Sequence, residues 1–216
     1  ALLVEGGVIP DDLTYRAALW ASGTARRLKA GEYRFDRALS PAEVLDKIAR
    51  GDVYVISITF PEGLTVAEMA TLFERHGLGP ATAFMDAAKR PAAVAAVDPG
   101  ARSLEGYLFP DTYAVSRHAD ADAVIAMMLD RFKRTMTEDL RAAAATRGLT
   151  TRALVTLASI VEKETGSAAE RPLVAAVYSN RLKIGMGLQC DPTLIYGLQV
   201  AGRYDGNLRR EDLQFD

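Results

Sequence analysis

The sequence predicts an α+β protein in which small α+β units precede a mainly α-helical domain. The segment 53–60, VYVISITF, is rich in β-branched and aromatic residues, as expected for a strand. Apolar residues at helical spacing dominate from residue 120 to residue 183. A turn sequence, Asp-Pro-Gly at residues 98–100, separates the two patterns. We therefore expect an α+β region over residues 1–100 and a helical domain over residues 101–216.

The first quarter of the chain predicts three helices and a strand. Residues 2–5 resemble the last turn of a helix, and a second helix with an apolar stripe through Leu13 and Trp20 follows. Residues 28–35 alternate aromatic and charged side chains, which is typical of a half-buried strand. Ser40 starts the third helix, with proline and glutamate in its first turn.

A faint internal repeat indicates two units of similar construction. A helix, a glycine turn, a proline and a second helix occur around Gly7 and again around Gly77. A short Gly-Tyr segment follows each pair, at residues 31–33 and 105–107. Two units of βααβ order would explain this, the first lacking its opening strand and the second beginning near residue 53.

The second half predicts long helices. One amphipathic helix should run from Asp120 to about Arg147, and another should start near Thr151. A further helix reaches Lys183, and a polar loop that includes Asp191 follows it. We expect this domain to be incomplete at its C-terminus, because the chain stops directly after a helix-like segment.

Composition excludes several classes of function. The 26 basic and 28 acidic side chains are interspersed and give a formal net charge of −2, so we expect no nucleic-acid partner. One cysteine, Cys190, and two histidines make a disulfide framework or a metal site improbable, and we expect no cofactor. No apolar run approaches the ~18 residues that a membrane-spanning helix needs.

Glu164 is the candidate catalytic residue, because the helix that starts near Thr151 should aim it inward. At about 100° per residue, Leu157 lies within about 20° of Glu164, and Ile160 and Val161 lie about 40° and 60° to either side. Glu162 is about 200° away and can reach solvent. Only Glu164 therefore follows the apolar stripe.

A carboxyl group packed against apolar side chains loses hydration, which raises its pKa and prepares it to act as a general acid near neutral pH. The alternative is that Glu164 pairs with Arg171 or caps the next helix. Helical geometry alone leaves both interpretations open.

Polar side chains around the following helix end are suited to a sugar, because amides and hydroxyls provide both donors and acceptors. Taken singly, each is more typical of turn chemistry. This cluster comprises Asn180, Arg181, Gln189, Asp191, Thr193 and Tyr196.

Three ordered motifs resemble the MltG (YceG-like) endolytic murein transglycosylases. The first covers residues 157–197 and includes the sequence EKET; the second is EGxxxPDT at residues 105–112. The third joins LKAGEYRF at residues 28–35 to PEGLT at residues 61–65. The resemblance extends over nearly the whole chain.

The resemblance implies LysM-like modules followed by a lysozyme-like catalytic domain, in a bacterial enzyme anchored in the inner membrane by an N-terminal helix absent from this chain. Its domain would face the periplasmic side and act in cell-wall synthesis and remodelling. The reaction would cleave the β-1,4 bond between N-acetylmuramic acid and N-acetylglucosamine within glycan strands, leaving 1,6-anhydro ends. Cell-wall synthases and divisome proteins are further possible partners.

The family's catalytic acid corresponds to Glu164, and Thr165 stands where related transglycosylases have serine. One carboxylate would suffice, because the sugar's own C6 hydroxyl replaces water as the nucleophile, whereas two-carboxylate glycosidases need a second acid. We expect Glu105 to be structural or to position substrate. Cys190 departs from the family pattern, in which a small polar residue is expected.

Seven residues are expected at the substrate site besides Glu164, namely Glu105, Thr165, Asn180, Gln189, Asp191, Thr193 and Tyr196. The competing hypothesis is a non-catalytic peptidoglycan-binding module, in which the LysM-like half holds glycan and the helical half is a scaffold. The intact EKET sequence favours the enzyme.

Overall fold

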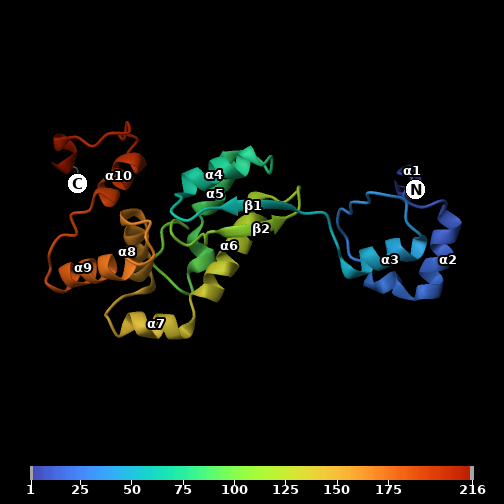
Figure 1. Ribbon diagram of the computed structural model, residues 1–216, viewed down its shortest axis with the longest axis horizontal. Helices are drawn as coiled ribbons and strands as arrows, with labels where there is room; N and C mark the ends of the chain where they lie inside the picture. The colour runs from blue at the N-terminus through green and yellow to red at the C-terminus, as the bar shows by residue number, and fades with distance from the viewer. Residues whose placement is uncertain (1, 215–216) are drawn as a thin grey trace. The chain divides into compact units, whose positions relative to one another are not determined.

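A computed structural model describes residues 2–214, and it confirms an α+β fold of two compact units (Figure 1). The first unit contains the chain up to Ile58 together with Tyr113–Ala119. The second contains Thr59–Thr112 and the chain from Asp120 onward. The division passes through both strands of the small sheet, and the domain boundary expected near residue 100 stays a prediction.

The first unit contains three α-helices. They are α1 (Leu2–Glu5), α2 (Asp12–Ser22) and α3 (Pro41–Arg50), with a 3₁₀ turn, η1, at Thr24–Arg27. The predicted start of α3 is confirmed, because Ser40 and Glu43 form a capping box and each side chain bonds the other's backbone N–H.

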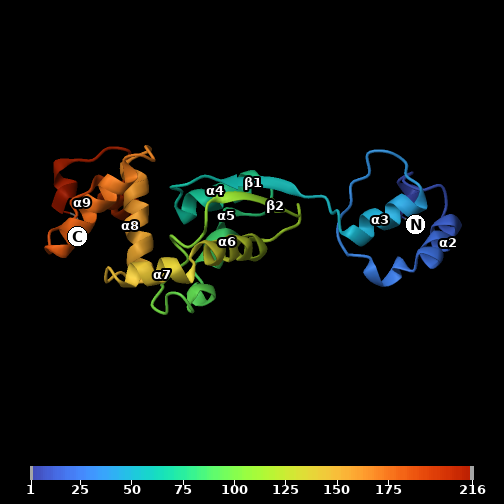
Figure 2. The same cartoon turned by 60° about the horizontal axis from the view of Figure 1, so that its bottom comes forward.

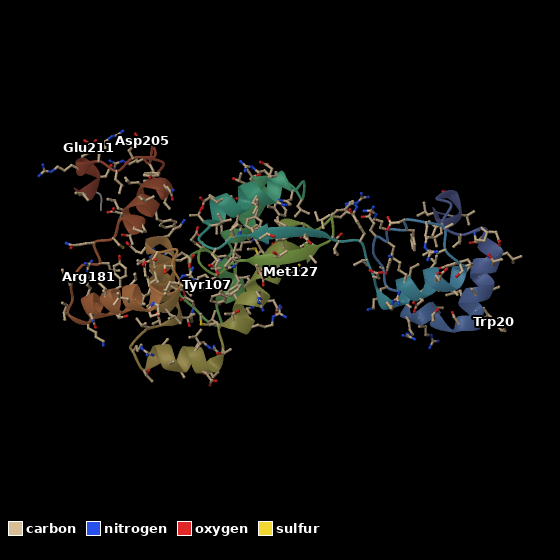
Figure 3. All side chains as sticks on the ribbon, in the orientation of Figure 1. Trp20, Tyr107, Met127, Arg181, Asp205 and Glu211 are labelled. Atoms are coloured by element: carbon tan, nitrogen blue, oxygen red, sulfur yellow. The ribbon has the colours of Figure 1, made fainter. Side chains whose placement is uncertain are left out.

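The apolar stripe predicted on α2 does not face a core. Leu13 and Trp20 are 78% and 88% exposed, and the Trp20 side chain projects away from the helix (Figure 3). No residue of α2 is buried. The helical spacing is therefore correct, but the expected burial is wrong.

The strand predicted at residues 28–35 is also wrong. The segment is irregular, and two separate backbone hydrogen bonds join it to the chain before β1, from Tyr54 N–H to Glu32 O at 2.6 Å and from Lys29 N–H to Ile48 O at 3.3 Å. Tyr33 donates its hydroxyl to the carbonyls of Lys29 and Ile48, at 2.7 and 3.2 Å. These hydrogen bonds of the Tyr33 side chain hold the segment in place. A strand would instead need a continuous ladder of backbone hydrogen bonds.

A two-stranded sheet pairs β1 (Ile56–Phe60) with β2 (Asp111–Val115). The hydroxyls of Thr59 and Thr112 share a hydrogen bond of 2.8 Å across the strands. Helices α4 (Val66–Arg75) and α5 (Ala81–Ala88) lie between the strands in the sequence, so the order is βααβ. The βααβ order expected from about residue 53 is therefore present, with its last strand at 111–115 and not at 105–107, where the chain turns. Among the described residues no strand precedes Ile56, so the internal repeat itself stays a prediction.

Aromatic side chains form the core behind this sheet in the second unit. Phe84 lies between Phe60 and Phe73, with ring centroids 6.2 and 5.3 Å apart. All three side chains are almost completely buried. Tyr107 meets Phe132 edge to face at 5.4 Å, which extends the apolar layer to α6 (Ala121–Thr135).

The long helix predicted from Asp120 to Arg147 is two helices. α6 ends at Thr135, and α7 (Glu138–Ala145) begins after Thr137. Thr137 accepts the Leu140 N–H through its side chain, so it caps a new helix. The apolar residues keep their helical spacing across the break between α6 and α7, so the periodicity of the sequence does not reveal that one helix ends and another begins there.

The remaining helices of the second unit follow in sequence order. They are α8 (Thr151–Glu164), α9 (Arg171–Lys183) and α10 (Asp191–Val200), with a 3₁₀ turn, η2, at Pro91–Val94 and a last one, η3, at Arg210–Gln214. α8 contacts α9, beside which it lies in Figure 2, and it also contacts α10. No helix of the described residues is long and apolar enough to cross a membrane.

An ion pair between the buried Asp98 and the half-exposed Arg152 anchors the start of α8. Both oxygens of Asp98 accept from Arg152, from Nε and Nη2, each at 2.8 Å. Tyr107 donates its hydroxyl to the same carboxylate, and Gly100 adds a backbone N–H at 3.2 Å. A Cβ at Gly100 would lie 2.7 Å from Arg152 Nη2, so a larger residue there would displace the end of the Arg152 side chain. We call Asp98, Arg152 and Tyr107 the anchor triad.

Candidate acid–base site at the end of α8

The apolar stripe of α8 is confirmed. Leu157, Ile160 and Val161 are buried, and they form a small core with Tyr178 of α9 and Cys190. Four partly buried apolar side chains pack around this core: Leu149, Val174, Ala175 and Leu188. This core fixes the last two turns of α8 against α9.

Glu164 itself is exposed, which corrects the expectation that it faces the interior. Glu164 does lie on the same side of α8 as Leu157 and Ile160, as its position in the helix predicts. However, Glu164 is the last residue of α8, and the apolar side chains that cover Leu157 and Ile160 do not extend as far as Glu164. Glu162, expected in solvent, is the more buried of the two glutamates, with a side chain 29% exposed. The desolvation expected at Glu164 is therefore absent.

Tyr178 is the side chain that holds Glu164. Its hydroxyl donates to Glu164 Oε1 at 2.8 Å. The tyrosine is only 7% exposed, and burial, followed by the hydrogen bond to Glu164, raises its pKa well above the usual range. The Arg181 guanidinium lies over its ring, 5.7 Å from the centroid. Tyr178 thus remains a proton donor that fixes one carboxylate oxygen, and the described residues give Oε2 no hydrogen-bond donor.

Thr165 orders the turn that follows Glu164. It is buried at the C-cap of α8, and its hydroxyl donates to Glu170 Oε2 at 2.7 Å. The Thr165 hydroxyl oxygen in turn accepts the Ser167 N–H at 3.0 Å. The residue therefore shapes the turn between α8 and α9, and both its donor and its acceptor are engaged within the protein.

Arg171 pairs with two other carboxylates and not with Glu164. It lies 3.0 Å from Glu162 and 3.5 Å from Glu62, which belongs to the turn at residues 61–65. A Cβ at Gly63 in that turn would lie 3.6 Å from the end of the Lys163 side chain. The turn of the third sequence motif thus packs on the last turn of α8, and the alternative pairing of Glu164 with Arg171 is wrong.

Glu105 binds the N-terminus of α4. Its two oxygens accept the Val66 N–H at 3.1 and 3.3 Å, and it also shares a hydrogen bond with Tyr196 of α10. Burial raises the pKa of this carboxyl, partly offset by these bonds. Glu105 and Tyr196, which are 91 positions apart in the sequence, therefore lie next to each other, and their role at a substrate site stays a prediction.

The other predicted residues lie on α9, α10 and the turn between them. The expected polar loop at 191–193 is the start of α10, where Asp191 is the first residue and Thr193 donates to the Cys190 carbonyl at 2.8 Å. Gln189 has φ of 49°, a left-handed backbone. Asn180, Gln189 and Asp191 are exposed, and within residues 2–214 no hydrogen bond joins their side chains to Glu164.

Sequence reasoning missed Tyr178 and the second partner of Arg171. Tyr178 follows Val174 by four positions on the face of α9 that packs against α8, so a hydroxyl on an apolar face was the available signal. Glu62 is 109 positions from Arg171, and no local pattern reports such a pair. Among the described residues, no cluster of three or more His, Cys, Asp or Glu side chains could hold a metal ion.

Fold and site together define an α+β protein in which a buried tyrosine, Tyr178, holds the exposed Glu164 carboxylate at the end of a helix. The model of the YceG-like family matches residues 1–216. An endolytic murein transglycosylase of Streptococcus pneumoniae strain D39 is 30% identical over 202 residues, covering 82% of this chain and 36% of the relative. One from Bacillus subtilis is 33% identical over 113 residues, covering 52% of this chain and 31% of the relative.

A crystal structure shares the fold. A YceG-like protein of Listeria monocytogenes superposes with a TM-score of 0.64 and 23% sequence identity, over 99% of this chain and 74% of that one. The chain belongs to the YceG-like family. It spans about a third of the length of the curated relatives that it matches.

Proposed function

We propose that this chain is the catalytic part of a lytic transglycosylase that cleaves peptidoglycan strands internally. The bond cut is the β-1,4 link between N-acetylmuramic acid and N-acetylglucosamine. The names of the curated relatives support the activity. The geometry around Glu164 supports the assignment of the acid, because a catalytic carboxylate must be reachable by a polymer and must also be held in place.

Glu164 acts twice in the proposed reaction. As an acid it gives its proton to the leaving O4 oxygen of N-acetylglucosamine while the C1–O4 bond of the muramic sugar breaks. As a carboxylate it then takes the proton of the C6 hydroxyl, whose oxygen closes on C1. The 1,6-anhydro ring forms without water, and the glutamate regains its proton. No second carboxylate is required.

One observation carries this proposal: Tyr178 binds Glu164 Oε1 and no described residue donates to Oε2. A carboxylate fixed through one oxygen presents the other in a defined direction, and proton transfer needs this geometry. The turn at 61–65 and the Glu105–Tyr196 pair bring the second and third motifs into the unit that contains α8. Glu105 acts there as a positioning residue, between α4 and α10.

The finer parts of the proposal follow from the family resemblance. The βααβ segment from β1 to β2 is a LysM-like unit, and the helices from α6 onward are lysozyme-like. The enzyme is bacterial, works on the extracytoplasmic side and is held at the inner membrane by an N-terminal helix. It takes part in cell-wall synthesis or remodelling, alongside cell-wall synthases or divisome proteins, and it uses no cofactor. The predicted substrate contacts at Asn180, Gln189, Asp191 and Thr193 belong to the same proposal.

Digestion of purified glycan strands tests the reaction. We expect new 1,6-anhydro-muramic ends, identified by mass spectrometry of the soluble products. Reducing muramic ends would mean that water attacks, which overturns the intramolecular step. Strands that bind but stay intact would support the non-catalytic binding module instead.

Tyr178→Phe tests the support of Glu164. The ring still fills its buried place, but Glu164 Oε1 loses its donor. A hydrogen bond to a charged group contributes about 1.5–3 kcal/mol, so we expect kcat to fall by about 10-fold or more with little change in KM. Steady-state cleavage measures both constants, and Tyr204→Phe is the control at a tyrosine outside this core. An unchanged kcat would contradict the positioning role.

A further inference from the structure

Helix α2 of the first unit presents an apolar face to solvent. At about 100° per residue, Leu13 and Trp20 lie about 20° apart on the helix, and Leu13 lies about 160° from Tyr15. Tyr15, Ala18 and Leu19 are half-buried, and α2 contacts α3. Leu13 and Trp20 are 78% and 88% exposed, on the other side of the helix. We call these two side chains the Trp20 face.

The chain that follows Leu13 carries a local excess of positive charge, although the net charge of the whole sequence is −2. Residues 13–31 contain no acidic side chain and four basic ones, namely Arg16, Arg26, Arg27 and Lys29. Arg26 and Arg27 form the last turn of η1, directly after α2, and both are exposed.

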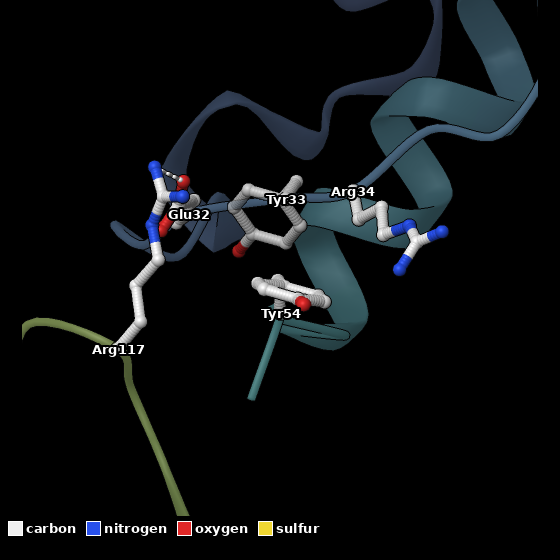
Figure 4. A pocket seen from close by; sticks show the side chains of 5 residues that line it. All are labelled: Glu32, Tyr33, Arg34, Tyr54 and Arg117. Atoms are coloured by element: carbon white, nitrogen blue, oxygen red, sulfur yellow. Dashed lines mark ion pairs between the residues drawn. The ribbon is translucent and has the colours of Figure 1, made fainter. Parts of the chain in front are cut away.

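Arg26 and Arg27 differ from the other basic side chains of the first unit because they have no acidic partner. Arg117 pairs with Glu32, as Figure 4 shows. Four more lie within 3.4 Å of a carboxylate, namely Arg34, Arg37, Lys47 and Arg50. Among the described residues, no hydrogen bond or ion pair joins the side chain of Arg26 or Arg27 to an acceptor. Two uncompensated cations therefore follow the Trp20 face directly.

The nearest acidic side chains in the sequence are engaged at the opposite end of α2. Asp11 caps the helix and accepts the Thr14 N–H at 2.8 Å. Asp12 lies 3.9 Å from Arg16. Trp20 belongs to the last turn of the helix. The end of α2 that contains Trp20 therefore combines an apolar side chain with unpaired positive charge.

We propose that the Trp20 face, together with Arg26 and Arg27, docks on the surface of a bilayer that contains anionic phospholipids. A tryptophan at the level of the headgroups buries its apolar ring and keeps its N–H hydrogen-bonded. Each basic side chain close to an anionic surface strengthens binding by about fivefold. Helices that lie in this interface carry Trp and Leu on one face and Lys or Arg beside it.

A lipid surface fits these observations better than a protein partner. A stable protein interface buries about 800 Å² on each side and needs a well-packed centre, whereas the Trp20 face consists of two side chains on one short helix. A fluid bilayer accommodates such a face without shape complementarity. The first unit itself makes this contact, so it is separate from the N-terminal membrane helix of the proposed function and does not depend on cleavage at Glu164.

The fluorescence of Trp20 tests the docking directly, because the chain contains one tryptophan. The whole chain is titrated with vesicles of phosphatidylcholine and phosphatidylglycerol in equal parts, and with vesicles of phosphatidylcholine alone. We expect the emission to shift to shorter wavelength with the anionic vesicles, as the indole leaves water. Affinity for the neutral vesicles should be at least about 10-fold lower, and salt should weaken binding to the anionic ones.

Two double variants of equal charge locate the contact. Arg26→Glu combined with Arg27→Glu should lower the affinity for anionic vesicles by about 25-fold or more, at about fivefold for each side chain. Arg75→Glu combined with Lys133→Glu, at exposed positions of α4 and α6, changes the net charge equally and should bind as the parent does.

Two further variants test the apolar part of the contact by co-sedimentation with the same vesicles. Trp20→Ala should lower the affinity by about 10-fold or more, because the largest apolar side chain of the face is lost. Ile184→Ala is the control, at a side chain of the second unit that is 75% exposed, and it should bind as the parent does.

Three results would overturn the docking surface. The first is an unshifted emission at excess anionic lipid. The second is equal affinity of the two double variants, because binding would then follow total charge and not the chain around α2. The third is an emission shift that appears when the chain is concentrated without lipid, because a second copy of the chain would then cover Trp20.

Discussion

The Glu164→Gln variant is expected to cleave glycan strands about 10²–10⁴ times more slowly than the parent chain. This is the usual contribution of a positioned general acid or base. Glutamine has the same shape, and its amide oxygen can still accept the Tyr178 hydroxyl, so the end of α8 keeps its structure. It cannot give a proton to the leaving oxygen or take one from the C6 hydroxyl. The rate of appearance of new chain ends on purified strands measures the loss.

Glu162→Gln is the matched control, since the two glutamates are two positions apart on the same helix. Glu162 pairs with Arg171 at 3.0 Å and is partly buried, so its loss should cost less than about 1 kcal/mol of stability. Cleavage should stay within a few-fold of the parent. If the Glu162 variant were inactive and the Glu164 variant were active, the acid would be assigned to the wrong residue.

Local signals in the sequence predicted the helices well. Serine, threonine and glutamate at helix starts report bonds within four residues, as at Ser40 and Glu43. The helical period likewise identified the buried stripe through Leu157, Ile160 and Val161. Helix caps and helical periodicity are set by residues close together in the sequence, so the sequence alone is enough to predict them.

Features that depend on distant partners were not predictable. Periodicity gives the direction of Glu164 but not whether another layer covers it, and at the last residue of α8 none does. The segment 28–35 has the alternation of a strand, but it lacks the neighbouring strand that would complete a ladder. The partners of Glu105, Val66 and Tyr196, lie on α4 and α10, so neither could be inferred from the residues around Glu105.

The Asp98→Asn variant is expected to lose about 2 kcal/mol of unfolding free energy near neutral pH, because the carboxylate loses its charge-assisted hydrogen bonds from Arg152 and Tyr107. Asp98 is 8% exposed, but the Arg152 side chain is 48% exposed, so water solvates the guanidinium in the variant and the loss is smaller than for a fully buried pair. Urea unfolding measures the difference. Asp130→Asn, which breaks the exposed pair of Asp130 with Arg134 on α6, should change stability by no more than about 0.5 kcal/mol.

The pH dependence separates the charge of Asp98 from its packing. The hydrogen bonds from Arg152, then from Tyr107, lower the folded pKa of Asp98 to about 2, whereas an unfolded aspartate has a pKa of about 3.9. Because the folded pKa is the lower one, the stabilisation is complete above the unfolded value and is lost as the pH falls through about 2. The stabilities of the parent and the Asp98→Asn variant should therefore converge between pH 4 and pH 2, in the range these pKa values set. A difference that persists undiminished at pH 2 would show that packing, and not the carboxylate charge, anchors the start of α8.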